Sequence, residues 1–287
     1  GGFLGIFMPK NSNLPTSAYR LVSSIIGYSS FVCWSVSFYP QIIINYQLKS
    51  VVGLSIDAQV FAWLNYLCYA MLSSALVWNQ DMKDNSKNMN GPDINTSIRS
   101  KELVNSIQSL LFTTILICQI IQYRGPNVNT VSVVTIGLVT TIALFCVTYV
   151  AGIFVYPSAC YWVDFFKALS FIMPTLTVCV YVPQLYLNKT RESTDGWNIW
   201  TVMLNFTASW LYLIQIVGDS VDIHSSHVLI CHWTKGLFCL INLVFGLLFS
   251  FQHHVLYRRN IVDDDLSIKS PIRPFGDFYE REHVMMV

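Results

Sequence analysis

The sequence YPQIIINYQLKSVVG, residues 39–53, recurs in a related form as VPQLYLNKTRESTDG at residues 182–196. The two stretches align at one constant offset without a gap, and five residues are identical over the fourteen positions that begin at Pro40. The identities are a Pro-Gln pair (Pro40-Gln41 and Pro183-Gln184), an asparagine (Asn45 and Asn188), a serine (Ser50 and Ser193) and a glycine (Gly53 and Gly196). This match predicts that the chain contains two copies of one structural unit.

The chain around these stretches is strongly apolar. Hydrophobic residues make up 53% of its 287 residues and charged residues 11%, and the mean hydropathy is +0.48. A soluble domain has about 25% charged residues, so the composition excludes a soluble enzyme and favours a lipid bilayer as the surroundings. The 17 basic and 16 acidic residues give a net charge of +1 with no basic stripe, which excludes nucleic acid as a partner.

Seven apolar runs are each long enough to cross a hydrocarbon core, which is about 30 Å thick and needs roughly 20 helical residues. They lack the alternation of barrel strands, so they predict helices. Trp and Tyr side chains at their ends suit the membrane interface. The runs are approximately Leu21 to Tyr46, Ile56 to Trp78, Leu103 to Tyr123, Val131 to Phe154, Trp162 to Leu187, Trp197 to Val217 and Trp233 to Tyr257.

The repeat divides these runs into two units. We expect an all-α membrane protein whose seven transmembrane helices form two parallel three-helix repeats joined by a linker helix, with a substrate site between the halves. The expected parts are an N-terminal segment (1–20), a first repeat (21–123) with a polar loop (79–99), the linker helix (131–154), a second repeat (159–257) and a solvated tail (258–287).

The prolines of the two matching stretches suggest hinges. Proline removes a backbone hydrogen bond from a helix and kinks it. Pro40 and Pro183 occupy corresponding places in the two halves, with Gln41 and Gln184 available to bond the freed backbone. Kinks at corresponding places predict hinges or gates that open one side of the protein at a time. The alternative is that these prolines only shape the helix ends.

No catalytic or metal-binding constellation is evident in the sequence, so we expect neither an enzyme nor a bound cofactor. The eight cysteines form no C-x-x-C pair and are interpreted mainly as apolar packing residues. Cys160 and Cys231 stand apart at one expected membrane face, where a disulfide is an open alternative.

Several motifs together point to a known family. They are WSVSFYPQ (34–41), KSVVGLSID (49–57), YVPQ (181–184), STDGW (193–197), Asn205-Phe206-Thr207, Lys235 and Phe251-Gln252-His253. In order and spacing they resemble the cystinosin branch of the PQ-loop transporter family, over about Leu21 to Arg259. Basic residues are evenly divided between the two sides, so the expected orientation comes from the resemblance alone.

The resemblance implies an integral protein of the lysosomal or vacuolar membrane that exports cystine or a similar amino acid, coupled to protons. It also implies a lumenal N-terminus, cytosolic Pro-Gln loops and a cytosolic C-terminus. Two alternatives stay open: a facilitator of a small neutral solute like the related SWEET sugar transporters, and a receptor or trafficking protein that has lost transport.

Polar residues in the apolar runs are the candidates for binding an amino acid, which needs donors for its carboxylate and acceptors for its ammonium. Packing between helices is the alternative role for each amide side chain, and snorkelling to the interface is the alternative for the lysine. The candidate substrate-binding residues are Asn65, Asn188, Thr201, Asn205, Gln215 and Lys235.

Asp57 and Glu102 are the candidates for proton coupling, although acids at helix starts also suit the helix dipole. Where the family carries two further aspartates and a lysine, this sequence has Asn205, Gly246 and Val180. Asparagine, glycine and valine do not titrate. We therefore expect transport to depend less on a pH gradient than the resemblance implies.

Overall fold

The computed structural model describes residues 14–78, 96–125, 130–224 and 233–257, with side chains from residue 100 onward in the second range. In these ranges the chain is helical. The helices are α2 (Ser17–Val36), α3 (Tyr39–Leu48), α4 (Ile56–Trp78), α6 (Thr96–Tyr123), α7 (Val133–Val155), α8 (Trp162–Arg191), α9 (Ile199–Asp222), α11 (Trp233–Phe251) and a π-helical turn η1 (Gln252–Leu256).

Seven helical spans in the described ranges are long and apolar enough to cross a membrane, as predicted, with α2 and α3 forming one span and α11 and η1 another. Most of the predicted polar loop and the whole predicted tail lie outside the described residues. Cys160 carries no disulfide, and its predicted partner Cys231 also lies outside them.

The two Pro-Gln pairs sit in different backbone settings. Pro40 is in the first turn of α3, where a missing N–H leaves no helical bond unmade, and α2 ends just before it with the Ser37 N–H bonded to the Cys33 carbonyl. Pro183 instead lies inside the continuous helix α8, together with Pro174. The first membrane span is therefore broken at its proline, whereas the fifth continues through.

Both stretches then end their helices in the same way. Lys49 after α3 and Glu192 after α8 adopt left-handed backbone conformations, with φ of 51° and 48°. A left-handed residue is a common helix terminator. The loops that follow are residues 49–55 and 192–198, and they are called the first and second PQ loops below.

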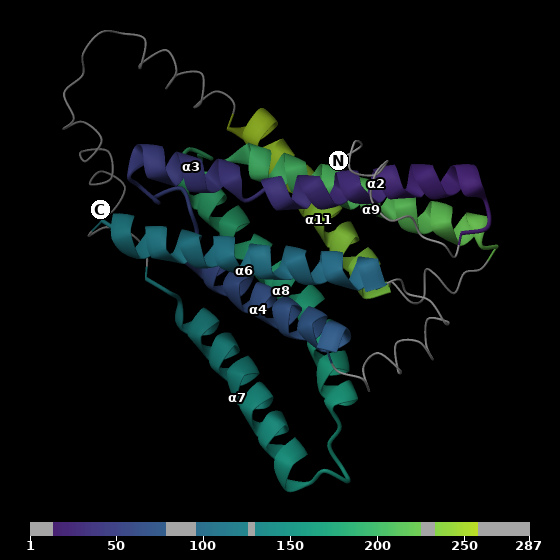
Figure 1. Cartoon of the computed structure of the whole chain (residues 1–287). Helices are drawn as coiled ribbons and strands as arrows, with labels where there is room; N and C mark the ends of the chain where they lie inside the picture. The colour runs from purple at the N-terminus through teal and green to yellow at the C-terminus, as the bar shows by residue number, and fades with distance from the viewer. Residues whose placement is uncertain (1–13, 79–95, 126–129, 225–232, 258–287) are drawn as a thin grey trace, which may run out of the picture.

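The two repeats interlock instead of lying apart. Helix α2 packs on α9, and α4 packs on α8, so the first helix of each repeat contacts the second helix of the other. Within each repeat α4 packs on α6, and α9 packs on α11. Figure 1 shows α2, α9, α6 and α4 side by side in the body of the bundle. This exchange gives the fold an approximate two-fold symmetry.

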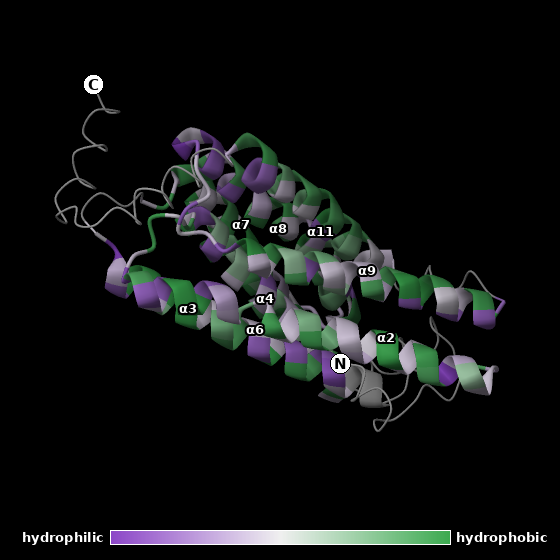
Figure 2. Cartoon of the chain, turned by 90° about the horizontal axis from the view of Figure 1, so that it is seen from above, coloured by the Kyte–Doolittle hydropathy of each residue, from purple (hydrophilic) through white to green (hydrophobic). Residues whose placement is uncertain are grey.

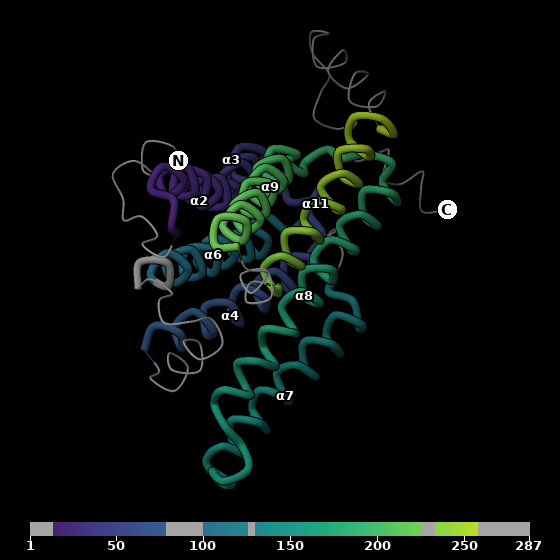
Figure 3. The backbone as a smooth tube through the Cα atoms, turned by 90° about the vertical axis from the view of Figure 1, so that its right-hand side faces the viewer, coloured from purple at the N-terminus to yellow at the C-terminus, as the bar shows by residue number. Residues whose placement is uncertain are grey.

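Helix α7 lies at the edge, beside the N-terminal half of α8 (Figure 3). It contributes to a core cluster centred on Phe61, Phe165 and Leu169, but apolar side chains such as Val133 and Phe154 are exposed. Hydrophobic residues, in green, occur along all the helices in Figure 2, and many large ones are exposed on the other helices as well. An exposed apolar surface of this extent fits lipid, not water.

Close packing of α9 on α11 depends on a glycine. A Cβ placed on the buried Gly246 would lie 2.7 Å from Cδ2 and 3.3 Å from Cβ of Phe206, whereas Gly236, two to three turns earlier in α11, has nothing within 4 Å. The Phe206 ring thus fills the place that a side chain at position 246 would occupy. A carboxylate at this position, which the family resemblance implies, would clash with Phe206 in this packing.

We predict that Gly246→Ala destabilises the protein by about 1–3 kcal/mol, because overpacking forces Phe206 and α9 to shift. Thermal unfolding of the purified protein in detergent measures the effect, with Gly236→Ala as the matched control on the same helix. A lower midpoint for Gly246→Ala and an unchanged or higher one for Gly236→Ala is the expected result. Equal midpoints for the two variants would contradict this packing.

Candidate functional site

At one end of the bundle, the glutamine of the first Pro-Gln pair binds the second PQ loop. The Gln41 side chain donates from Nε2 to the Gly196 carbonyl at 3.1 Å and accepts at Oε1 from the Asn198 N–H at 2.8 Å. The side-chain amide of Asn198 also donates, from Nδ2, to the Pro40 carbonyl at 3.3 Å. The Gln41 side chain is therefore held by backbone atoms of the other repeat.

The second Pro-Gln pair makes the reciprocal contacts. Gln184 donates from Nε2 to the Gly53 carbonyl at 3.0 Å and accepts at Oε1 from the Ser55 N–H at 2.9 Å. Gly53 and Ser55 correspond to Gly196 and Asn198 at the same offset that relates the two glutamines. Each glutamine thus forms hydrogen bonds with the equivalent two backbone groups of the opposite loop. This is the geometry expected when two repeats are related by a two-fold axis.

Each glutamine is also anchored within its own repeat. Gln41 donates to Asn45 at 2.8 Å, and Asn45 donates to Gln119 of α6 at 3.1 Å. In the second repeat Gln184 donates to Asn188 at 2.9 Å, and Asn188 donates to Gln252 of η1 at 3.2 Å. All six amides are buried. Two matching chains of three amides therefore run from the third helix of each repeat to the opposite loop.

The two loops touch at their glycines. A Cβ on Gly196, whose φ is +75°, would lie 3.2 Å from the Gly53 nitrogen and 3.3 Å from its Cα. Only residues without a side chain allow this approach. We call this end, with its paired loops and six amides, the PQ end. It is closed in this structure.

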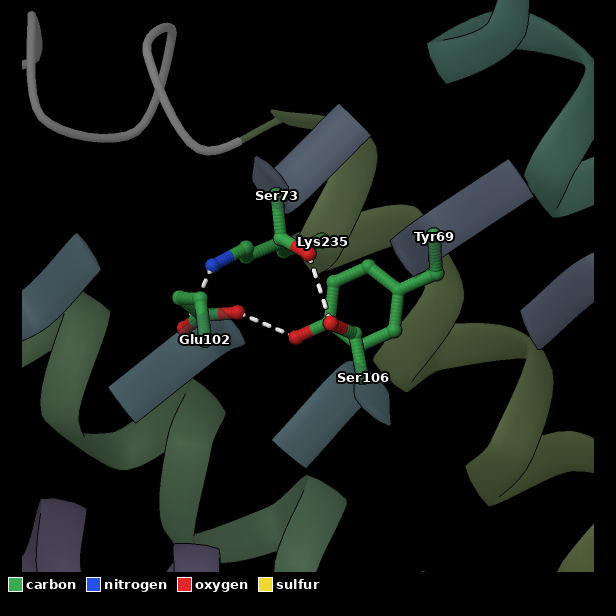
Figure 4. Close-up of polar contacts among 5 residues, drawn as sticks. All are labelled: Tyr69, Ser73, Glu102, Ser106 and Lys235. Carbon is green, nitrogen blue, oxygen red and sulfur yellow. Dashed lines mark hydrogen bonds and ion pairs between the residues drawn. The ribbon is translucent and has the colours of Figure 1, made fainter. Parts of the chain in front are cut away.

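At the opposite end, two charged residues meet across the bundle. The Lys235 ammonium of α11 lies 2.6 Å from Glu102 Oε1 of α6, and the Tyr69 hydroxyl of α4 donates to the other oxygen of the same carboxylate. Beside them the Ser73 and Ser106 hydroxyls are 2.6 Å apart (Figure 4). Glu102 lies between four and five helical turns before Gln119 on α6, so this pair is about 25 Å from the PQ end.

The ion pair occupies symmetry-equivalent positions. Lys235 follows Glu102 in the sequence at the same interval at which Gln252 follows Gln119. Tyr212, which corresponds to Tyr69 at the offset of the two Pro-Gln pairs, lies under the Lys235 ammonium with the ring centroid 5.9 Å away. The same site in the two repeats thus carries an acid in one and a base in the other, each beside a tyrosine. The charged residues at this end therefore differ between the two repeats, whereas the six amides at the PQ end are the same in both.

Between these two ends, polar atoms are buried without partners. Buried polar groups are normally hydrogen-bonded, so each exception needs an explanation. In the part of the chain that the structure describes, these atoms belong to five helices (α2, α4, α6, α9 and α11) and are Trp34 Nε1, Ser35 Oγ, Asn65 Oδ1, Asn105 Oδ1, Thr201 Oγ1, Ser209 Oγ and Asn242 Nδ2. The set offers both donors and acceptors to a polar ligand.

The candidate substrate residues fall into different places. Asn65 and Thr201 belong to the unpartnered set, with the Asn65 Nδ2 donating to Thr177 at 3.1 Å. Asn205 is half-buried one turn after Thr201 on α9. Asn188 is part of the PQ-end network, and Gln215 donates to Ser23 of α2 at 3.2 Å. The last two are therefore engaged in contacts between helices in this structure.

The charged candidates also separate. Glu102 and Lys235 are paired with each other, whereas Asp57 lies near the PQ end, where its carboxylate accepts the Ser132 N–H at 2.9 Å just before α7. Asp57 therefore ties the linker helix to α4. Asp164 and Lys167 form a local ion pair at 3.5 Å. Val180 packs against the core cluster of α4, α7 and α8.

Sequence reasoning missed Asn105, Trp34, Asn242 and the Gln119–Gln252 pair. The sequence did contain a signal for the correspondence of Gln119 and Gln252. When the third helices of the two repeats are aligned with a shift of about three turns relative to the Pro-Gln alignment, Gln119 matches Gln252 and Glu102 matches Lys235. The gapless alignment of the Pro-Gln stretches hides this match. No group of His, Cys, Asp or Glu side chains suited to a metal ion occurs among the described residues.

Two three-helix units that each hold the other's loop through a Pro-Gln glutamine define a PQ-loop membrane transporter. A family model described as "PQ loop repeat" matches residues 22–82 and 165–225, once in each unit. The chain belongs to the PQ-loop family and is related to the cystinosins within it. Members of this family are transporters and not enzymes.

The relatives cover most of the chain. A "Cystinosin homolog" of Dictyostelium discoideum is 33% identical over 243 residues, 84% of each chain. "Cystinosin" of Bos taurus is 32% identical over 261 residues, 91% of this chain and 69% of the relative. A "Cystine transporter" of Saccharomyces cerevisiae is 22% identical over 275 residues, 88% of this chain and 99% of the relative.

We predict that Gln41→Ala lowers the stability of the protein because it leaves the partly buried Gly196 carbonyl and Asn198 N–H without their partner, at up to about 1–3 kcal/mol for each such group. Gln184→Ala is expected to do the same through Gly53 and Ser55. Thermal unfolding in detergent measures both, with Gln47→Ala as the control, since Gln47 is exposed on the same helix α3. If Gln47→Ala and Gln41→Ala shifted the midpoint equally, the network would not stabilise the fold.

Proposed function

We propose that this chain carries cystine or a similar amino acid from the lumen of a lysosome or vacuole to the cytosol by alternating access. The observation that supports this most is the closed PQ end, where Gln41 and Gln184 hold the two loops together across the repeats. The printed names of the relatives, cystinosin and cystine transporter, supply the substrate.

In this proposal the PQ end faces the cytosol, the N-terminus is lumenal and the C-terminal tail is cytosolic. Export then requires the PQ loops to separate. The bonds that must break are those from Gln41 and Gln184 to the opposite loop, while the bonds within each repeat, such as Asn45 to Gln119, stay intact. Each repeat can thus move as a unit, with the break before Pro40 and the proline Pro183 inside α8 as hinges.

The substrate would bind between the ends. Its ammonium needs acceptors such as Asn65 Oδ1 and Asn105 Oδ1, and its carboxylate needs donors such as Trp34 Nε1 and Asn242 Nδ2, all of which are buried and unpartnered. The Glu102–Lys235 pair lies on the lumenal side of this set in the proposed orientation. Opening of that pair would offer one charge of each sign to an entering zwitterion.

Proton coupling is proposed to be weak. Asn205 brings no carboxyl group to α9, and Phe206 fills the space at Gly246. Of the two candidate acids, Glu102 has its carboxylate bound by Lys235 and Tyr69. Asp57 is bound to the Ser132 N–H at the start of the linker helix.

We predict that vesicles containing the full chain release preloaded labelled cystine, and that an acidic lumen changes the rate of release by no more than about threefold. The assay compares vesicles with and without a pH gradient, and Glu102→Gln and Asp57→Asn are tested beside the wild type. Strong gradient-driven release that is lost in either variant would overturn weak coupling. Uptake of glucose without cystine would favour the sugar facilitator, and binding of no solute would favour a receptor without transport.

A further inference from the structure

An apolar groove lies at the PQ end, where the last turns of α6 meet the first turns of α4 and the residues just before α7. Its volume is about 290 Å³. Ile121 in its wall is 73% exposed, so the groove opens to the surroundings of the bundle. Figure 1 shows α7 diverging from α6 at this end. The apolar lining of the groove consists of Ile56, Val60, Ile117, Ile120, Ile121 and Val131.

Two polar side chains complete the groove. Arg124 follows the last residue of α6 and is exposed, and Gln59 of α4 is half-buried. Neither side chain forms a hydrogen bond or an ion pair with any residue in the described ranges. The Arg124 guanidinium is therefore available to an anion that comes from outside the protein.

The groove has the depth and direction of a lipid molecule. Arg124 follows Tyr123, and tyrosines at the ends of membrane spans mark the interface where lipid headgroups lie. Ile117 lies about two helical turns before Arg124, which places it about 10 Å deeper along α6. A charged headgroup at Arg124 would thus continue into an apolar chain along the isoleucines.

The other charged side chains near this groove are engaged by the protein. Asp57 of α4 accepts the Ser132 N–H at 2.9 Å. The Lys49 ammonium lies 3.5 Å from the centroid of the Tyr46 ring and 3.5 Å from the Tyr123 hydroxyl. Residues 126–129, between the described ranges, are Pro-Asn-Val-Asn and carry no charge. Arg124 is therefore distinguished by its place at the mouth of the groove, and not by a surplus of charge.

We infer that this groove binds a membrane phospholipid, with the phosphate on Arg124 and one acyl chain against the isoleucines. The planar guanidinium fork matches two phosphate oxygens, and basic pockets between membrane helices are suited to phospholipid headgroups. Ile56 and Ile120 also belong to the core cluster that contains Val51 of the first PQ loop and Trp197 of the second. The bound chain would therefore support the packing beneath both loops. Binding requires no transport, so this site is independent of the proposed function.

Lipid titration of the purified full chain in a neutral detergent tests the inference. A lipid that binds only the folded state raises the unfolding midpoint, and the titration yields its Kd. Phosphatidylglycerol is compared with diacylglycerol of the same acyl chains, at equal ionic strength. We expect phosphatidylglycerol to bind at least about tenfold more tightly, because its phosphate adds charge-assisted hydrogen bonds. Equal binding of the two lipids would overturn the inference, as would inorganic phosphate binding as tightly as phosphatidylglycerol.

The variant Arg124→Gln removes the guanidinium. It is expected to weaken phosphatidylglycerol binding about tenfold and to leave diacylglycerol binding unchanged. Arg124→Lys keeps the charge without the fork and is expected to restore part of the binding. Lys189→Gln is the matched control, since Lys189 is an exposed cation in the last turn of α8 at the same end. Equal losses in Arg124→Gln and Lys189→Gln, or no loss in Arg124→Gln, would contradict the assigned phosphate site.

The variant Ile121→Trp tests the place of the acyl chain, because a larger side chain fills the groove. It is expected to weaken binding of both lipids about tenfold, through the lost burial of methylene groups. Leu111→Trp is the control, since Leu111 is 57% exposed on the same helix and lies outside the groove. Lipid binding that Ile121→Trp leaves intact would show that the chain lies elsewhere and would overturn the inference.

Discussion

The fold depends on the requirement that polar groups buried in a membrane protein find partners inside the protein. At the PQ end this requirement is met across the repeats, because Gln41 and Gln184 each satisfy a carbonyl and an N–H of the opposite loop. Removing either loop would leave the Oε1 atom of the other repeat's glutamine without its hydrogen-bond donor. The two repeats are therefore mutually dependent, and the bonds that stabilise the closed end are the ones that break in the proposed transport cycle.

The symmetry of the bundle is kept at the PQ end and lost in the middle and at the opposite end. The amide chains of the two repeats match residue for residue, and Phe38 stacks on Phe112 as Tyr181 stacks on Phe245. At the opposite end the equivalent positions carry Glu102 and Lys235. In the middle, the Asn65–Thr177 contact has Ala208 and Trp34 at the corresponding positions. An asymmetric site suits a ligand whose two ends differ in charge.

Much of the architecture follows from the sequence. Run length gives the seven helices, and the match between residues 39–53 and 182–196 gives the repeat. Sequence does not give the partner of a helix, so the exchange of α2 and α8 between repeats and the role of Gln41 in the opposite loop were not predicted. Gln215 shows the same limit. Its side-chain amide could bind a ligand, but only the packing of the helices shows that it donates a hydrogen bond to Ser23. Pro40 shows a second limit of the sequence, because its place in the first turn of α3 depends on where α2 ends.

The central claim is that the two PQ loops separate during transport. Spin labels at Ser50 and Ser193, one in each loop, measure the distance between them in the full chain in lipid vesicles. We expect a short distance in the closed state and a second, longer distance that becomes more populated when cystine is added. A single short distance in a preparation that transports cystine would contradict the claim, because transport would then proceed with the PQ end closed.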